Sequence, residues 1–175
     1  MHPRAAELIE TLDLQPHPEG GDFAQVYRSP STVTPDDDRD TRVALTTIYF
    51  LLTEGQTSAW HRVRSDEVWH FYEGEPLALT WADAEGANAV THILGPVGAD
   101  HTPVGADHTP VGADQRPVAV VPAGCWQTAR PPGAYALVGC TVARGFEYDD
   151  FELVADGSAI GETLRQCLLE LSTGS

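Results

Sequence analysis

Short apolar segments alternate with polar stretches rich in glycine and proline along most of the chain. The apolar segments carry many β-branched and aromatic residues, a composition that favours strands. Strands are predicted over residues 23–28, 43–52, 76–81, 89–94, 117–121, 134–142 and 145–154. Residues 3–13 and 160–171 have the spacing of amphipathic helices. This pattern favours a double-sheet β-barrel with a helix near each end.

The most informative stretch covers residues 55–74, where two further strands flank a polar turn at residues 64–66. Side chains alternate along a strand, so His61 and Val63 share one face before the turn, and Glu67 shares a face with the aromatic residues after it. Folded as a hairpin, the stretch brings His61 and Glu67 onto one wall. A histidine and a carboxylate placed in this way can transfer protons near neutral pH.

The same stretch resembles the first motif of the cupin superfamily, which runs glycine, five residues, His-x-His, three or four residues, glutamate, six residues, glycine. Gly55, His61, Glu67 and Gly74 stand at the matching positions. Val63 stands where the second metal-binding histidine of the motif is expected. The resemblance therefore implies the cupin fold with one metal ligand replaced by a hydrocarbon side chain.

Two other segments carry the resemblance. Residues 122–127, Pro-Ala-Gly-Cys-Trp-Gln, are similar to the second cupin motif, Pro-x-Gly-x-x-His, with Gln127 in place of the histidine. Residues 16–21, Pro-His-Pro-Glu-Gly-Gly, precede an aromatic strand that ends in Tyr-Arg-Ser. This resembles the N-terminal signature of a cupin subgroup catalogued as a domain of unknown function. The similar segments span about residues 5–155.

The resemblance implies an all-β protein built as a double-stranded β-helix, the jelly-roll barrel of cupins. We expect one domain over residues 1–175, because a chain of this length can bury a sizeable core. The barrel is expected over about residues 14–154 and the C-terminal helix over about residues 158–171. A ligand inside such a barrel lies between its two sheets.

The positions that bind metal in many cupins hold His61, Val63, Glu67 and Gln127 in this chain. A stable transition-metal site needs three or four nitrogen, sulfur or carboxylate ligands. Because Val63 and Gln127 both replace an imidazole, we expect no tightly bound metal and no other cofactor. A weak divalent-metal site formed by His61, Glu67 and Gln127 stays open as an alternative.

Aromatic walls with a few polar groups suit a small-molecule site. Among cupins, the nucleotide-sugar 3,5-epimerases work without a metal and abstract a proton next to a ketone, and the segment from Glu19 to Arg28 loosely resembles their N-terminal strand. Arg28 is a candidate for holding an anionic group. The predicted ligand-binding residues are Gln127, Trp69, Phe71, Trp126, Arg28 and Glu19.

Three functions stay open on these grounds. The first is a metal-independent sugar or nucleotide-sugar epimerase or isomerase in which His61 and Glu67 are catalytic. The second is a non-catalytic cupin that binds a small molecule, and the third is a metal-dependent oxygenase or isomerase. The fold alone does not choose among them, because function depends on the site.

Charge and composition narrow the partners. The chain has 26 acidic and 10 basic residues and a formal net charge of −16, a balance that repels phosphate backbones and anionic lipid. We therefore expect neither nucleic acid nor a membrane as a partner. Three widely spaced cysteines indicate no disulfide framework and favour the cytoplasm. Cupins of this type pair through their sheets, and the apolar strand 43–52 suits covering on both faces, so we expect a homodimer.

A seven-residue repeat lies between two predicted strands. Pro-Val-Gly-Ala-Asp occurs three times, beginning at residues 96, 103 and 110. The unit is too short for a solenoid, and its glycine and proline exclude a coiled coil. We predict that Pro96–Arg116 is an exposed loop whose first two copies are dispensable for folding. His101 and His108 are then copies of one position rather than metal ligands.

Overall fold

The computed structural model describes residues 1–96 and 115–173. The first of its two large sheets contains β1 (Gln15–Pro16), β2 (Asp22–Arg28), β5 (Leu45–Thr53), β7 (Glu67–Gly74), β11 (Val118–Val121) and β13 (Tyr135–Ala143). The second contains β6 (His61–Val63), β8 (Leu77–Ala82), β9 (Val90–Leu94), β10 (Gln115–Arg116), β12 (Trp126–Arg130) and β14 (Phe151–Leu153). A small ribbon pairs β3 (Thr32–Val33) with β4 (Arg42–Val43). The helices in the described residues are α1 (Pro3–Thr11), the short 3-10 helix η1 (Tyr148–Asp150) and α2 (Ala159–Thr173).

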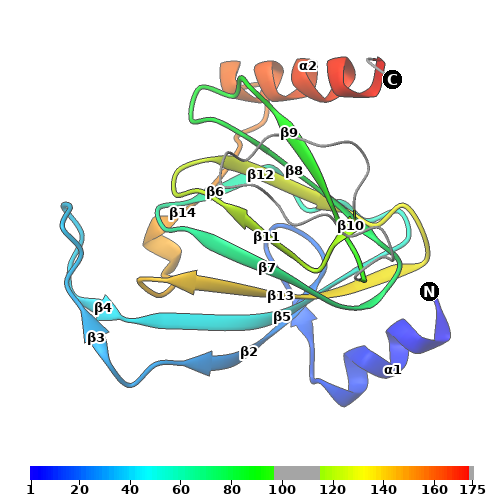
Figure 1. The fold of residues 1–175 in the computed structure, drawn as a ribbon, viewed down its shortest axis with the longest axis horizontal. Helices are drawn as coiled ribbons and strands as arrows, with labels where there is room; N and C mark the ends of the chain where they lie inside the picture. Colours follow the sequence, from blue (N-terminus) through cyan, green and yellow to red (C-terminus); the bar gives the residue numbers. More distant parts are fainter. Residues whose placement is uncertain (97–114, 174–175) are drawn as a thin grey trace.

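The two six-stranded sheets face each other across the core (Figure 1). The strand order is β1-β2-β5-β13-β7-β11 in the first sheet and β10-β9-β8-β12-β6-β14 in the second. Consecutive strands therefore often lie in different sheets, as when the chain passes from β5 to β6 and from β6 to β7. Within the described residues, the large sheets pair antiparallel except where β10 runs parallel to β9. The predicted jelly-roll barrel with a helix near each end is confirmed.

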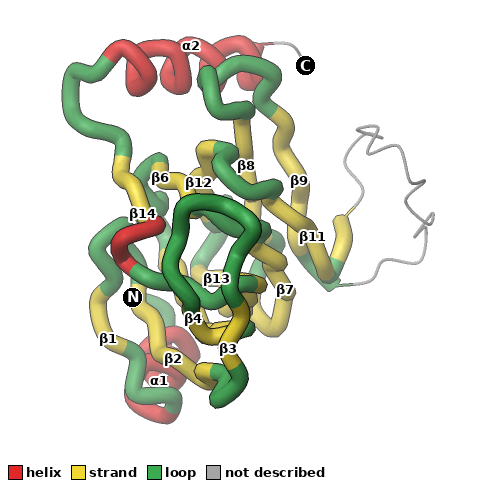
Figure 2. Tube along the Cα trace, turned by 90° about the vertical axis from the view of Figure 1, so that its left-hand side faces the viewer, coloured by secondary structure: helices red, strands yellow, loops and turns green. Residues whose placement is uncertain are grey.

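The two helices cover the outer faces of opposite sheets (Figure 2). Helix α1 begins at a proline, which suits the first helical turn, and packs Leu8 in a cluster with Leu51 of β5. Helix α2 packs Leu164 in a cluster with Ala82 of β8. The apolar strand 43–52 was predicted to be covered on both faces. At Leu51, the chain's own N-terminal helix covers its outer face.

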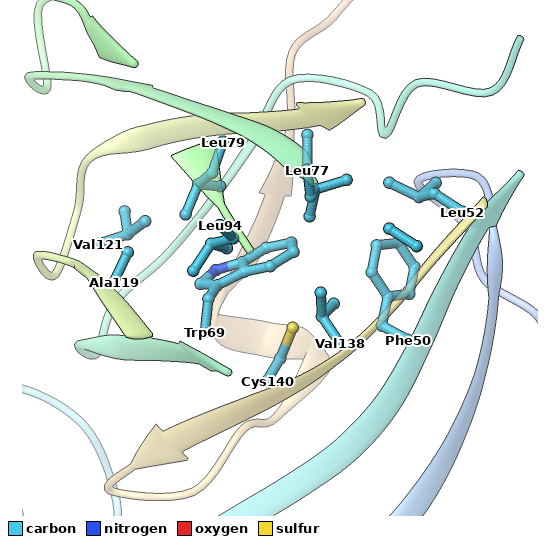
Figure 3. Packing of buried hydrophobic residues seen from close by; sticks show 12 residues of the cluster. Phe50, Leu52, Trp69, Leu77, Leu79, Leu94, Ala119, Val121, Val138 and Cys140 are labelled. Atoms are coloured by element: carbon cyan, nitrogen blue, oxygen red, sulfur yellow. The ribbon is translucent and has the colours of Figure 1, made fainter. Parts of the chain in front are cut away.

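The core between the sheets is built from inward side chains of both (Figure 3). Phe50, Trp69 and Val138 come from the first sheet, and Leu77 and Leu79 from the second, all of them almost completely buried. This alternation of inward and outward residues is the pattern expected of strands in a double-sheet barrel. The core supports one wall of the cavity described below.

The predicted hairpin around residues 64–66 is wrong. Strand β6 pairs with β12 and β14, whereas β7 pairs with β11 and β13, so the two strands belong to different sheets. The turn between them crosses from one sheet to the other. Ser65 in this turn is buried, and its hydroxyl accepts a hydrogen bond from Arg39 Nη1 at 2.9 Å. Consequently His61 and Glu67 lie on facing sheets rather than on one wall.

The predicted strand over residues 145–154 is correct only for its last part, β14. Before it, the backbone leaves β13 through Arg144, whose φ of 65° is left-handed, and then forms η1. The Phe146 amide donates to Thr46 Oγ1 at 2.9 Å, and the buried Asp150 carboxylate pairs with Arg39 and Arg42. These long-range contacts, which no local pattern encodes, hold the segment against the barrel instead of extending it.

Residues 97–114 lie outside the described residues, and with them most of the repeat predicted as the loop Pro96–Arg116, including His101 and His108. The segment that follows is β10, whose Gln115 and Arg116 pair with the end of β9. Across the part of the chain that the structure describes, no helix is long and apolar enough to cross a membrane.

Candidate functional site

A cavity of about 320 Å³ lies between the two sheets. Its lining comes from β2, β5, β7 and β13 of the first sheet, from β6 and β14 of the second, and from the segments that precede β2 and β14. Four of its side chains are acidic groups or imidazoles, and most of the others are apolar or aromatic. The lining residues are His17, Glu19, Phe23, Gln25, Thr46, Ile48, Phe50, His61, Val63, Glu67, Cys140, Val142, Phe146, Tyr148 and Phe151.

His61 enters the cavity from β6 and is almost completely buried. Its Nδ1 lies 2.8 Å from the carbonyl oxygen of Ala59, which can only accept, so Nδ1 carries the hydrogen. In the neutral ring, Nε2 is then a lone-pair acceptor. Burial lowers the pKa of His61 to about 4, so the imidazole is neutral near pH 7.

Glu19 is the side chain that meets His61. Its Oε2 lies 3.2 Å from His61 Nε2. Burial raises the pKa of Glu19 well above its ordinary value, and the charge of Glu67 raises it further. A protonated Glu19 that donates to the free lone pair of His61 satisfies both groups. Glu19 was predicted as a ligand-binding residue, and Glu67 as the residue that faces His61. In the structure, Glu19 is the carboxyl group next to His61.

The Pro-His-Pro-Glu-Gly-Gly segment positions Glu19 through its glycines. Gly21 has a φ of 72°, and a Cβ there would stand 2.7 Å from the carbonyl oxygen of Leu51. The tight turn lets the Glu19 carbonyl accept a hydrogen bond from the Ala59 amide at 2.7 Å. The same short stretch of chain therefore ties both Glu19 and His61 in place.

Glu67 enters from β7 of the facing sheet. Its Oε2 accepts a hydrogen bond from Gln127 Nε2, and Gln127 Oε1 accepts one from Trp69 Nε1 at 3.1 Å. The Cys140 thiol also hydrogen-bonds to Glu67. Burial raises the pKa of Glu67 to about 7, against the opposing effect of the Gln127 and Cys140 hydrogen bonds. Glu67 therefore changes charge near neutral pH.

The remaining predicted ligand-binding residues do not line the cavity. Gln127 and Trp69 are completely buried behind Glu67 and hold it. Phe71 packs against the barrel core. Arg28 is exposed and pairs with Glu147 at 2.6 Å, so it is engaged on the surface rather than at the site.

The placement of Trp126 in the cavity is also wrong. Residues 126–130 form the strand β12, in which Gln127 points inward and its neighbour Trp126 must therefore point outward. Trp126 packs under α2 in the cluster that contains Leu164, and the guanidinium of Arg62 lies 4.4 Å from its ring centroid. The second motif thus contributes Gln127 as a support for Glu67.

Sequence reasoning missed the aromatic wall of the cavity. Phe146, Tyr148 and Phe151 line it from the segment that was predicted as a strand. The ring centroid of Phe151 lies 5.5 Å from that of His61 and 5.8 Å from that of Phe146. Three aromatic residues within six positions were the available signal, but their shared direction depends on the irregular backbone before β14.

His17 belongs to the N-terminal motif but was not among the predicted site residues. Its ring centroid lies 4.6 Å from that of Phe23, and its Nδ1 lies 3.6 Å from Glu19 Oε2. The Glu19 amide donates to the same Nδ1 at 3.4 Å, so this nitrogen is an acceptor. Burial lowers the pKa of His17 to about 4.

The residues present do not fit the metal site of other cupins. Within the described part of the chain, no three histidine, cysteine or acidic side chains are grouped as metal ligands. Val63 presents carbon to the cavity where an imidazole is expected. Both polar atoms of Gln127 are occupied by Glu67 and Trp69, and His61 Nε2 faces Glu19.

Comparison with known families decides the classification. Residues 6–154 match the family described as Cupin superfamily (DUF985). The chain belongs to this cupin family. A crystal structure of protein SO0799 from Shewanella oneidensis is 31% identical, with a TM-score of 0.74, and the match covers 96% of this chain and 94% of that one. A comparison with curated proteins finds no match.

Two further solved structures show the same cupin fold. A hypothetical protein from Leishmania major is 28% identical, with a TM-score of 0.74, over 93% of this chain and 97% of that chain. The capsular polysaccharide assembling protein CapF from Staphylococcus aureus is 10% identical, with a TM-score of 0.53, over 81% of this chain and 33% of that chain. At that identity the likeness to CapF concerns the fold alone.

Proposed function

We propose that this cupin binds a small molecule inside its barrel and acts on it as a metal-independent isomerase or epimerase of the sugar type. The observation that carries the proposal is the pair of coupled carboxyl groups, Glu19 and Glu67, in one cavity. One is held protonated against His61, and the other changes charge near pH 7. Two titratable groups whose environments separate their pKa values are the arrangement expected of an acid and a base.

The proposed reaction moves protons only. Ionised Glu67 removes the proton from a carbon next to a carbonyl group, so the C–H electron pair forms an enolate. Glu19, whose proton is shared with His61, protonates the developing oxyanion. Return of a proton to carbon, with loss of the proton from oxygen, gives the epimer or the isomer. Because ionised Glu67 raises the pKa of Glu19, one group stays an acid while the other is a base.

Hydrogen–deuterium exchange tests this function. The protein is incubated in D₂O with a panel of unphosphorylated aldoses and ketoses, and deuterium at carbon is followed by NMR. We expect incorporation next to the carbonyl group with the native protein and a loss of at least about tenfold in rate with Glu67→Gln. Glu54→Gln on the surface is the matched control.

A sugar that binds without exchange would contradict the catalytic proposal. It would instead favour the second function left open by the sequence, a cupin that binds a small molecule and does not transform it. The same completely buried Gln127–Trp69 support behind Glu67 would then serve to orient a bound ligand.

Two features beyond the site are part of the proposal. We propose that the protein works in the cytoplasm, because Cys125, Cys140 and Cys167 are all free and Cys140 is needed as a thiol beside Glu67. We also propose a homodimer formed through the first sheet. Val118 and Val120 on its edge strand β11 are 44% and 47% exposed, which supports covering by a second copy.

A further inference from the structure

We infer that the ligand of this cavity is an uncharged, single-ring molecule that carries hydroxyl or carbonyl oxygens, rather than a phosphorylated, carboxylated or amino compound. The inference rests on the proposed function, since it takes the cavity as the working site, and it narrows the substrate to unmodified ring molecules. It therefore excludes the nucleotide sugars that the sequence analysis left open as ligands of this site.

Among the residues that the structure describes, none with a fixed positive charge lines the cavity. The chain contains no lysine, and its ten basic residues are arginines that all lie within the described residues. None of the ten lines the cavity. Eight of them are paired with acidic side chains elsewhere: Arg4, Arg28, Arg39, Arg42, Arg62, Arg64, Arg144 and Arg165. A phosphate or carboxylate inside the barrel would therefore be buried without a counter-charge, which is costly.

The polar end of the cavity is satisfied by neutral groups. Two ring nitrogens, His61 Nε2 and His17 Nδ1, face Glu19 Oε2 at 3.2 Å and 3.6 Å. His61 Nδ1 donates to the Ala59 carbonyl oxygen, which leaves His61 Nε2 as an acceptor, and the Glu19 amide donates to His17 Nδ1, which makes that nitrogen an acceptor too. An ionised Glu19 would present its negative oxygen to two lone pairs, so the carboxyl fits here only as a neutral acid.

This network also disfavours a cationic ligand. An ammonium group gains most beside an ionised carboxylate, and ionised Glu19 would leave His61 Nε2 buried without a donor. Glu67 is already in contact with Gln127 and Cys140, both of which donate to it. The groups that remain for a ligand are a neutral acid and an acceptor-rich carboxyl, which suit carbonyl and hydroxyl oxygens.

The size and walls of the cavity set the shape of the ligand. A volume of about 320 Å³ corresponds to roughly ten water-sized groups, enough for one substituted ring. One wall of the cavity is aromatic: Phe146, Tyr148 and Phe151 contact one another with ring centroids 5.2–6.3 Å apart. A ring with one apolar face and oxygens at its edge can stack on this wall and reach Glu67.

Two matched series of probes test the inference. Glucose, glucuronate and glucosamine share one ring and differ in charge, as do benzyl alcohol, benzoate and benzylamine. Dissociation constants are measured at pH 7 by ligand-detected NMR on the full-length native protein. We expect the neutral member of at least one series to bind at least about tenfold more tightly than both charged members.

Each other outcome overturns the inference. Tighter binding of glucuronate or benzoate would show that the cavity accepts an anion, and tighter binding of glucosamine or benzylamine would show a cation site. Failure of both neutral probes to bind at millimolar concentration would show that the cavity is not matched to rings of this size. These outcomes concern affinity alone, so they are distinct from failure of deuterium exchange, which contradicts catalysis.

A gain of function at the rim tests the electrostatic cause. Gln25 lines the cavity from an exposed position on β2, where an arginine can be accommodated. Gln25→Arg should improve the binding of glucuronate and benzoate about tenfold relative to Gln25→Met, a control that introduces a long side chain without a charge. Equal affinities for the two variants would show that the missing cation is not what excludes anions, and would overturn the inference.

Discussion

Individual side chains in this protein gain their properties from burial more than from their immediate sequence neighbours. Glu19 and Glu67 have raised pKa values, and His17 and His61 have lowered ones, because desolvation opposes the charged form of each group. His17 and His61 are therefore neutral near pH 7, whereas Glu67 changes charge there.

The pKa of Glu67 predicts a pH-dependent stability. The folded-state value is about 7, above the ordinary 4.5, so stability from this group is fully present below pH 4.5 and is lost as the pH rises through 7. Glu67→Gln removes the ionisation but keeps an acceptor for Gln127. The difference in unfolding free energy between the variant and the native protein should therefore shift in favour of the variant by on the order of 2–3 kcal/mol from pH 5 to pH 8.

Chemical denaturation at several pH values measures this difference. The matched control is Glu54→Gln, which makes the same substitution at an exposed position away from the cavity. A flat difference for Glu67→Gln would contradict the raised pKa. The groups that surround Glu67 and must stay unchanged in the comparison are Gln127, Cys140 and Glu19.

The close approach of Glu19 Oε2 to His61 Nε2 predicts a contrast between two substitutions. Glu19→Gln keeps a donor for His61 Nε2, so thermal denaturation should show little loss of stability, while deuterium exchange should be lost with the acidic proton. Glu19→Ala leaves Nε2 buried without a partner and should cost about 1–3 kcal/mol of unfolding free energy. Equal stability of the two variants would show that Nε2 is satisfied in another way.

The replaced metal ligands give a third prediction. Purified native protein should carry less than a stoichiometric amount of iron, zinc, manganese or nickel by elemental analysis, because Val63 offers no ligand and Gln127 is occupied. The double variant Val63→His, Gln127→His restores the motif beside His61 and Glu67 and should take up zinc or nickel. One metal ion per native chain would refute the first part.

At the level of elements, the segment before β14 is held by charge rather than by strand pairing. Asp150 in η1 is buried between Arg39, at 3.3 Å, and Arg42, and Arg39 also donates to Ser65 in the turn between the sheets. These contacts join the β3–β4 ribbon, the crossing turn and the aromatic wall of the cavity.

This linkage makes Asp150 a sensitive position. Asp150→Ala should lower the unfolding free energy by about 1–3 kcal/mol, because it removes the acid that pairs with the buried Arg42 guanidinium, whereas Arg39 keeps its ion pair with Asp37. It should also weaken the binding of any cavity ligand through Tyr148 and Phe151. Asp149→Ala, at the exposed neighbouring position, is the matched control. Similar thermal denaturation of both variants would show that the linkage contributes little.

For the whole molecule, the formal charge of −16 and the exposed apolar side chains of β11 act in opposite directions on self-association. We expect pairing through the first sheet to prevail at physiological salt, where surface repulsion is screened. Light scattering should then give about twice the monomer mass of 18.9 kDa. A mass near 18.9 kDa at micromolar concentration would contradict the dimer, and Val120→Glu should shift a real dimer toward monomer.

The sequence by itself determined the fold class and the inward direction of the main site residues. Alternation along β6 and β7 places His61, Val63 and Glu67 on buried faces, and the glycines of the two motifs place the turns. These are local properties, since a strand's two faces and a turn's backbone angles depend on neighbouring residues.

Only the tertiary structure decided which of these side chains meet. The turn at residues 64–66 crosses between sheets, so His61 pairs with Glu19, which lies 42 positions earlier in the chain, and Glu67 pairs with Gln127. The aromatic wall arises because Asp150 is drawn to Arg39 and Arg42. Such contacts follow from sheet topology and from the pairing of buried charges, and neither is specified by the residues adjacent in sequence.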